Sequence, residues 1–477
     1  MSEKHSENKN TKALKAGVWY SASSIAVKAI TILTTPIFTR LIDKEQMGIV
    51  STFNSWYTLL LIFCSLNLTY SIGRAKLDFP GKFDEYVGSM QVLSFLFTGV
   101  LCIVSLPFLS PIAKAFELNE NLVLILMVFL LFHPVINFMQ SKFRYSYKYK
   151  GNIAIAAYST ISNVVISLLL LMVFTQEKYY ARVFGHVLPA VLLGIAFWIV
   201  TIKNKNAVIN LEYWKYGLGI GLPLIFHSVS LNILGQSDRI MITKYCGTGF
   251  TAIYSIAYGY ALLINIILGA ANEAWLPWFH DTYFAEEYDS IRKNVKPLVV
   301  LGCMLGIGCV AIGPEAMAVL GPKDYQVGVW VIAPVTIGTV CQFIYQQYVH
   351  IELHLKKTQY ISMGTIISAC LNIGLNFIFI PKYGFIAAAY TTLVSYLVNM
   401  LVHFFVTRVI LKVKLYDDWF MFVALGIVAA VSAVFMLLYS TILIRYALLV
   451  VICALYFILN RKTIVVAYNN IKKKKSK

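Results

Sequence analysis

"ASSIAVKAITILTTPIFTRLI" (residues 22–42) is long and apolar enough to cross a bilayer, yet it carries Lys28 near its middle. About 20 apolar residues suffice for a transmembrane helix, and such stretches recur along the whole chain. Of the 477 residues, 59% are hydrophobic and 13% are charged, whereas soluble domains have about 25% charged residues. The sequence therefore predicts an all-α, multi-pass membrane protein.

Hydropathy predicts about fourteen transmembrane helices joined by short connections. We expect them near residues 14–39, 47–72, 86–110, 120–140, 152–174, 181–202, 217–243, 250–272, 297–320, 327–350, 359–380, 384–407, 419–438 and 442–460. The longest expected connection, residues 273–296, leaves no room for a soluble domain. The polar start "MSEKHSENKNTK" lacks the features of a removable signal peptide.

The positive charges agree with this helix count. With a cytoplasmic N-terminus, the inner segments hold 29 of the 40 Lys and Arg residues and the outer segments hold 10. Basic loops remain inside during insertion, so both termini are predicted to be cytoplasmic. The net charge of +18 then reflects topology and attraction to anionic membrane lipids rather than a nucleic-acid partner.

The chain also shows a weak internal repeat. "DKEQMGIVSTFNSW" (43–56) can be laid on "CGTGFTAIYSIAY" (246–258) with a shift of 204, and "YSTISNVVIS" (158–167) on "MGTIISACLN" (363–372) with a shift of 205. Two parallel six-helix lobes are a recurrent transporter plan, with the substrate path between them. We expect a cytoplasmic tail (1–13), an N-lobe (14–205), a C-lobe (206–410), two further helices (411–460) and a basic cytoplasmic tail (461–477).

Lys28 belongs to a polar stripe on the first helix. A charge at mid-bilayer costs about 2.5–3.5 kcal/mol, so it usually faces a protein interior or water. Ser24 and Thr31 share its helix face, as do Ser21, Thr35 and Thr39. The stripe predicts that Lys28 points toward a polar interior and has a functional role, because simple helix contacts do not need a charge.

Three other helices carry polar faces. His227 and Asp238 lie on the seventh, Asn163 on the fifth and Asn372 on the eleventh. Ser, Thr and Asn faces also serve as simple contacts between helices, and a lone histidine also serves packing, so both interpretations stay open for these faces.

Three arginines lie near predicted helix ends. Arg40 and the pair Asp238–Arg239 lie toward the outer end, where an interfacial salt bridge is the alternative to a cavity role, and Arg74 at the inner end can simply mark topology. We find no phosphate-binding glycine loop, metal-ligand cluster or catalytic constellation. We expect no cofactor, and energy from a Na⁺ or H⁺ gradient or the membrane potential.

Several segments resemble the Wzx-type polysaccharide flippases, members of the multidrug/oligosaccharidyl-lipid/polysaccharide exporter superfamily. "PIFTRLIDKEQMG" (36–48) is similar to their opening, and residues 222–260 resemble their seventh and eighth helices. "NEAWLPWF" (272–279) and residues 356–397 are similar to later family segments. The resemblance covers residues 15–410.

This resemblance implies a transporter, not an enzyme, in a prokaryotic inner membrane, with two lobes around a central cationic cavity. It implies transfer of undecaprenyl-diphosphate-linked oligosaccharide from the cytoplasmic to the outer leaflet by alternating access, for surface polysaccharide biosynthesis. The substrate-binding candidates are Lys28, Arg40, Arg74, Arg239, Ser24, Thr31, His227, Asn163 and Asn372, and Asp238 is the candidate for ion coupling. We expect a monomer that can associate with other polysaccharide-assembly membrane proteins.

Two alternatives remain. A drug or metabolite antiporter of the same architecture should favour carboxylates for cationic substrates, and central acids are scarce here. A polysaccharide polymerase or ligase in the membrane usually has one long outer loop with acidic and basic groups, whereas no predicted outer connection here exceeds about a dozen residues.

Overall fold

The computed structural model describes the backbone of residues 2–475 and the side chains of residue 19 and residues 22–458. Every regular element in this part of the chain is helical, so the expected all-α fold is confirmed. Twelve described helices are long and apolar enough to cross a membrane, and a bent pair makes a thirteenth candidate. The described part of the last expected span, Ile442–Ile458, is a shorter apolar helix. The side chains of residues 1–13 and of the basic tail 461–477 lie outside the described part.

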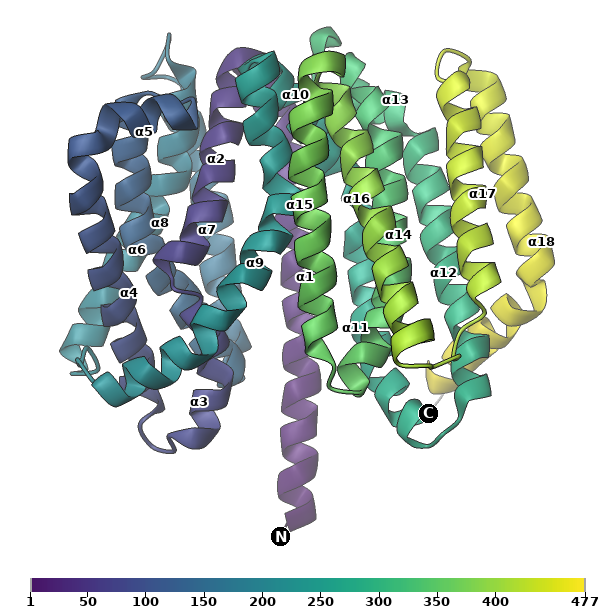
Figure 1. The fold of residues 1–477 in the computed structure, drawn as a ribbon, viewed down its shortest axis with the longest axis horizontal. Coiled ribbons are helices and arrows are strands. Elements are labelled where there is room, and N and C mark those ends of the chain that lie inside the picture. The colour runs from purple at the N-terminus through teal and green to yellow at the C-terminus, as the bar shows by residue number, and fades with distance from the viewer. Residues whose placement is uncertain (1, 476–477) are drawn as a thin grey trace. The chain divides into compact units, whose positions relative to one another are not determined.

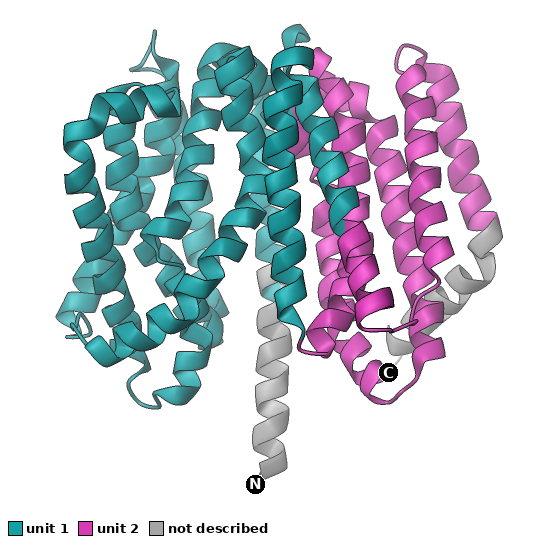
Figure 2. Cartoon of the chain, viewed as in Figure 1, with its two compact units in different colours: residues 1–256, 319–325, 357–399 teal, residues 257–318, 326–356, 400–477 magenta. Residues whose placement is uncertain are grey.

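The chain divides into two compact units (Figure 2). Unit 1 holds residues 1–256, 319–325 and 357–399, and unit 2 holds residues 257–318, 326–356 and 400–477. The expected division into two lobes and two extra helices stays a prediction.

Unit 1 is built from ten helices, with short 3₁₀ turns at η1 (Leu68–Tyr70) and η2 (Leu106–Phe108) (Figure 1). They are α1 (Ser2–Leu41), α2 (Lys44–Cys64), α3 (Ile72–Asp78), α4 (Phe83–Ser105), α5 (Leu109–Phe116), α6 (Glu120–Tyr145), α7 (Tyr149–Leu170), α8 (Lys178–Lys203), α9 (Leu211–Cys246) and α15 (Thr358–Tyr383). Within the unit, α7 packs on α8 and α1, α6 packs on α8 and α4, and α9 packs on α2 and α15.

Unit 2 contains α11 (Ile264–Phe284), α12 (Tyr288–Ala311), α14 (Val329–His354), α17 (Asp418–Leu437) and α18 (Ile442–Lys475). Here α12 packs against α11, α14, α17 and α18. Four elements cross the unit boundaries: α10 (Thr248–Ala261), α13 (Gly313–Leu320), η3 (Lys323–Gly328) and α16 (Phe385–Phe405). The π-helical turn η4 (Val406–Ile410) follows α16.

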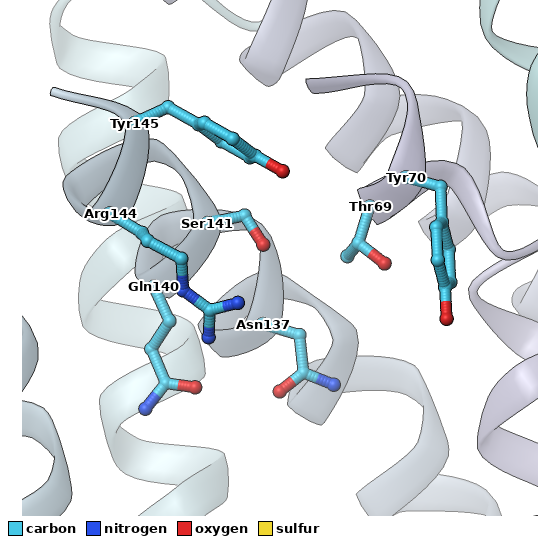
Figure 3. Close-up of a pocket in the computed structure, with 7 residues that line it drawn as sticks. All are labelled: Thr69, Tyr70, Asn137, Gln140, Ser141, Arg144 and Tyr145. Atoms are coloured by element: carbon cyan, nitrogen blue, oxygen red, sulfur yellow. The ribbon is translucent and has the colours of Figure 1, made fainter. Parts of the chain in front are cut away.

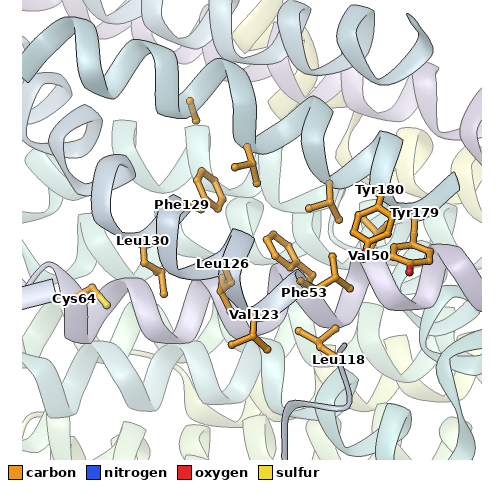
Figure 4. Close-up of a cluster of buried hydrophobic side chains, with 14 of the residues drawn as sticks. Val50, Phe53, Cys64, Leu118, Val123, Leu126, Phe129, Leu130, Tyr179 and Tyr180 are labelled. Atoms are coloured by element: carbon orange, nitrogen blue, oxygen red, sulfur yellow. The ribbon is translucent and has the colours of Figure 1, made fainter. Parts of the chain in front are cut away.

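The apolar core of unit 1 joins α2, α6 and α8 (Figure 4). Phe53 and Phe129 are fully buried there, and Leu126 is 2% exposed. Helix starts are fixed by local hydrogen bonds. Asn119 caps α6 by accepting from the backbone N–H of Leu122 at 2.8 Å, as N-cap asparagines commonly do.

One expected connection is wrong. Residues 273–296 were expected to form a long loop, but α11 continues to Phe284 and α12 begins at Tyr288. The segment is polar enough to lower its hydropathy, yet it contains good helix formers and aromatic residues that pack on one another, such as Trp275 and Trp278 at 4.7 Å between ring centroids. Hydropathy therefore marked the end of the apolar stretch and not the end of the helix.

Candidate functional site

Arg182 carries a permanent positive charge inside the spans of unit 1, on the second turn of α8. Its Nη1 donates to Asn163 Oδ1 and, at 3.1 Å, to Ser167 Oγ, both on α7. The ring centroid of Phe38 from α1 lies 4.2 Å from the guanidinium carbon, which is a cation–π contact. Only neutral groups among the described residues hold this cation.

A cavity of about 230 Å³ opens beside Arg182. Its lining comes from α2, α7 and α8: Val50, Asn54, Tyr57, Thr58, Asn163, Arg182 and His186. His186 Nδ1 lies 3.2 Å from Asn54 Oδ1, so these two side chains hold each other at the wall. None of the described lining residues carries a carboxylate, so the lining bears a positive charge. We call this space the Arg182 cavity.

One face of α6 continues the polar surface from this cavity. The hydroxyl of Tyr57 lies 2.9 Å from His133 Nδ1 on α6. Polar residues follow at three- and four-residue steps, which place them on one helix face: His133, Asn137, Gln140, Ser141 and Arg144. The first four are half-buried and Arg144 is exposed.

The last four residues of this face line a second cavity of unit 1, with a volume of about 330 Å³. Figure 3 shows Asn137 and Arg144 on α6 facing Thr69 and Tyr70 of η1. This cavity lies at the end of α6 that the charge distribution predicts to be cytoplasmic. Unit 1 therefore has a polar surface that runs along α6 from a predicted cytoplasmic opening toward the Arg182 cavity.

Asp238 lies in a separate polar cluster of unit 1, where it is fully buried. Its Oδ2 accepts from the Tyr254 hydroxyl at 2.5 Å and from Thr392 Oγ1 at 2.7 Å, and its Oδ1 accepts from Asn376 Nδ2 at 2.7 Å. Asn372 extends the cluster, because its Nδ2 donates to Thr392 at 3.2 Å. The cluster joins α9 to α10, α15 and α16 and surrounds one carboxylate with amide and hydroxyl groups.

The residues predicted on α1 are largely exposed. Ser24, Lys28 and Thr31 are all exposed, and no hydrogen bond or ion pair joins Lys28 to another described residue. The Thr31 hydroxyl donates to the Val27 carbonyl at 3.0 Å. Lys28 thus has no described partner, and its predicted position facing a cavity stays a prediction.

Arg40 lies at the end of α1 within unit 1. It donates to the carbonyls of Pro36 at 2.9 Å and Val319 at 3.0 Å. It lines a cavity of about 290 Å³ that it shares with two lysines and three carboxylates: Lys44, Lys178, Asp43, Glu45 and Asp324. Its surroundings are therefore close to neutral, unlike those of Arg182.

Arg74 lies in the short helix α3, outside the candidate spans. It pairs with Asp78 at 2.9 Å, and its side chain is 69% exposed. The hydrogen bond from Tyr216 and the one from Arg74 lower the pKa of Asp78. Part of the charge of Arg74 is thus already matched by a carboxylate of the chain.

Arg239 and His227 lie on α9. Arg239 Nε donates to Ser255 Oγ at 3.1 Å, and its guanidinium lies 5.9 Å from the Tyr254 ring centroid. His227 is half-buried, and its Nδ1 has no hydrogen-bond partner among the described residues. The structure thus places Asn163 beside Arg182, and it places Asn372 in the cluster of Asp238, whose Tyr254 ring Arg239 also contacts. No described contact joins the remaining predicted residues to either group.

Comparisons with known proteins identify the family. Residues 13–283, more than half of the chain, match the family described as "Polysaccharide biosynthesis protein". The chain belongs to this family. The sequence-based assignment to polysaccharide-exporting membrane proteins is thereby confirmed.

Individual relatives of this polysaccharide biosynthesis protein are distant. It is 24% identical over 254 residues to "Probable flippase AglR" of Haloferax volcanii, covering 50% of this chain and 51% of that protein. It is 24% identical over 330 residues to "Teichuronic acid biosynthesis protein TuaB" of Bacillus subtilis, covering 66% of this chain and 65% of that protein.

Solved structures share the fold. "Lipid II flippase MurJ, inward closed conformation" superposes with a TM-score of 0.73 at 15% identity, covering 94% of this chain and 100% of that chain. An outward-facing multidrug resistance MATE family transporter of the MOP superfamily gives 0.57 at 16% identity, covering 84% of this chain and 96% of that chain. This family member therefore has the fold of membrane transporters.

Sequence reasoning missed Arg182 and the α6 face in this polysaccharide biosynthesis protein. Arg182 is the second residue of the expected helix 181–202 and was not named as a candidate, and Arg144 falls in the basic connection expected between helices 120–140 and 152–174. Helical spacing in the sequence could have identified Arg182 and the α6 face. Arg182 and His186 are four residues apart, and His133 begins a polar series that reaches Arg144.

Proposed function

We propose that this polysaccharide biosynthesis protein is a flippase that moves undecaprenyl-diphosphate-linked oligosaccharides from the cytoplasmic to the outer leaflet by alternating access. One observation carries the proposal: the polar, cationic surface formed inside the spans of unit 1 by the Arg182 cavity and the α6 face. Similarity to proteins named as flippases, and a fold shared with transporters, support a lipid-linked cargo.

The physical need for such a surface is simple. A diphosphate with attached sugars cannot cross about 30 Å of hydrocarbon unaided, because burying unpaired charges and hydroxyls is costly. Side-chain amides, hydroxyls and cations inside the spans replace water for the head group, while the polyprenyl chain stays in lipid.

Lys28 is our first candidate for the diphosphate, because it is exposed within α1 and pairs with no described carboxylate. Its ammonium is a compact charge that can bind and release a phosphate. Ser24, Thr31, Asn163 and Asn372 are candidates for sugar hydroxyls, and His227, Arg40, Arg74 and Arg239 complete the proposed binding set. The pairing of Arg74 with Asp78 makes it the weakest cationic member of that set.

Asp238 is the proposed coupling residue, by binding Na⁺ or H⁺. Hard cations prefer oxygen ligands, and the carboxylate accepts from the hydroxyls of Tyr254 and Thr392. Asn376 Nδ2 donates both to this carboxylate and to Asn372 Oδ1. The two hydroxyls and the Asn376 amide now donate to the carboxylate. If these hydrogen atoms rotate away, the oxygen atoms can coordinate a small cation. We expect Asp238→Asn to abolish any Na⁺ or pH dependence of transport.

Transport of a lipid-linked saccharide tests the proposal. The protein is reconstituted in liposomes with a fluorescent undecaprenyl-diphosphate oligosaccharide on one leaflet, and its appearance on the other leaflet is measured. We expect wild-type protein to accelerate transfer, Lys28→Ala to abolish it while inserting normally, and Lys28→Arg to keep part of it. Normal transfer by Lys28→Ala would remove Lys28 from the mechanism.

A deletion strain separates the flippase from its alternatives. A flippase mutant should accumulate the lipid-linked repeat unit on the cytoplasmic side of the inner membrane. Accumulation on the outer side would instead indicate a polymerase or ligase, and unchanged lipid-linked saccharides with altered drug resistance would indicate an antiporter. The same strain, expressing the protein with reporters at either end, tests the cytoplasmic position of both termini.

A further inference from the structure

Arg182 differs from two other span-embedded arginines in what balances its charge. In unit 2, Arg408 pairs with Asp418, with its Nη2 at 2.6 Å from the carboxylate, and Arg445 pairs with Glu315. The Nη1 of Arg182 instead donates to Asn163 and Ser167, and no described residue accepts from its Nε or Nη2.

The positive charge of Arg182 has no described carboxylate beside it, so an anionic ligand would stabilise it. Charged residues in transmembrane segments are costly and usually pair with one another or mark a substrate path. The N–H groups of Arg182 that no described residue accepts belong to a residue that lines the cavity, and the Phe38 ring, 4.2 Å from the guanidinium carbon, provides no acceptor oxygen. A ligand that enters the cavity can therefore bind the guanidinium edge.

The size of the cavity limits the ligand. Its volume of about 230 Å³ is below the roughly 300–1,000 Å³ of pockets for drug-sized ligands. It exceeds the space of a few waters, at about 30 Å³ each. It therefore suits one sugar ring rather than an oligosaccharide. The neutral polar residues of its lining, Asn54, Thr58 and Asn163, provide amides and a hydroxyl that can bind sugar hydroxyls.

The charge of the cavity limits the ligand further. The lining provides a single permanent cation, which matches a group with one negative charge. The planar guanidinium fork fits the two oxygens of a carboxylate. A diphosphate carries more charge and would leave most of it unmatched here.

We propose that the Arg182 cavity binds the carboxylate of an acidic sugar, such as a hexuronate residue, within the transported oligosaccharide. This inference rests on the proposed flippase function, and it names the substrate class of one subsite. Arg182 holds the carboxylate, and Asn163 and Ser167 on α7 position the guanidinium.

Direct binding tests the subsite. Purified full-length protein in nanodiscs is titrated with methyl glucuronide, methyl glucoside or inorganic pyrophosphate, with thermal unfolding recorded to confirm folding. We expect wild-type protein to bind the glucuronide at least tenfold more tightly than the glucoside. Arg182→Gln should lose this preference, and Arg182→Lys, which keeps the charge but not the fork, should retain part of it.

A matched control removes a nearby charge outside the cavity. Lys178 lies one turn before Arg182 on α8 and donates to the Leu41 carbonyl at 2.9 Å. Lys178→Gln should keep the wild-type preference for glucuronide. Equal binding of glucuronide and glucoside by wild-type protein would overturn the proposal, as would an unchanged preference in a folded Arg182→Gln protein or tighter binding of pyrophosphate than of glucuronide at this site.

The transport assay distinguishes this inference from the flippase proposal. Two lipid-linked saccharides that differ only in one glucuronate-for-glucose exchange are compared. We expect Arg182→Gln to slow the acidic cargo at least tenfold and the neutral cargo much less. Equal transfer of both cargoes by Arg182→Gln overturns the subsite alone. Failure of wild-type protein to move either cargo overturns the flippase, while the glucuronide titration still decides the subsite.

Discussion

Gly185 allows α8 to pack closely on α7 next to Arg182. A Cβ atom at this position would lie 2.0 Å from Ser167 Oγ, 2.8 Å from the Ser167 nitrogen and 2.9 Å from the Asn163 carbonyl oxygen. Small residues let membrane helices approach in this way. Replacing Gly185 by alanine therefore tests both the packing of this seam and its effect on Arg182.

The size of the effect follows from these distances. Ordinary contacts begin near 3.4 Å, so two backbone atoms must withdraw by about half an ångström. Overpacking of this kind costs about 1–3 kcal/mol, and the better helix propensity of alanine returns up to about 1 kcal/mol. We expect Gly185→Ala to destabilise the protein by about 1–2 kcal/mol. It should also move Asn163 and Ser167 away from Arg182 and slow transport of an acidic cargo.

Thermal unfolding in detergent and the transport assay measure the two effects. The matched control is Gly219→Ala on α9, where an added Cβ meets nothing within 4 Å, so its melting temperature should be unchanged or higher. Adding Ser167→Ala to Gly185→Ala removes the nearest clash but not the two backbone clashes, and should restore only part of the stability. A Gly185→Ala protein as stable as the Gly219→Ala control would refute the packing argument.

Two further predictions concern unit 2. Arg445→Leu should destabilise the protein by less than the about 3–5 kcal/mol of a fully buried pair, because the arginine is 1% exposed but the Glu315 side chain left unpaired is 34% exposed. Adding Glu315→Gln should recover part of the loss in thermal unfolding. The pKa of Asp417 lies below its usual 3.8, first because Lys296 donates to it at 2.8 Å. Its stabilising contribution is therefore complete above that value and is lost as the pH falls below it. The melting temperature of Asp417→Asn should thus fall less than that of wild-type protein between pH 5 and 3, and equal slopes would contradict this assignment.

The fold was predictable because hydropathy and charge act over whole segments. Twenty apolar residues identify a span whatever their order. The helix ends were less predictable, because a polar stretch such as residues 273–284 continues a helix after the apolar stretch ends. The same uncertainty left Arg182 at the edge of the expected helix 181–202, and Arg182 was not named as a candidate.

The candidate site was predictable only in part, because residue contacts depend on helix rotation. Asp238 and Arg239 are neighbours in sequence, and an interfacial salt bridge was the alternative to a cavity role for this pair. Adjacent helical residues point in different directions. Asp238 contacts Thr392 on α16 and Asn376 on α15, whereas Arg239 contacts Ser255 on α10. Asn372 was named from its own helix face, but its link to Asp238 through Thr392 required coordinates.

The internal repeat predicted from the sequence would relate the two polar clusters of unit 1. A shift of 204 or 205 maps α2 onto α10 and α7 onto α15, and it maps Val50 onto Tyr254 and Ser167 onto Asn372. The first member of each pair lines the Arg182 cavity or contacts Arg182, and the second belongs to the cluster of Asp238.

The clusters differ in the sign of their single charge. One cluster surrounds a guanidinium with neutral amides and hydroxyls, and the other surrounds a carboxylate in the same way. The first can therefore receive an anionic cargo group, while the second can hold a cation. This division predicts that Arg182→Gln changes cargo preference without changing ion dependence. Asp238→Asn should change ion dependence without changing cargo preference, and a variant that altered both properties would argue against separate roles.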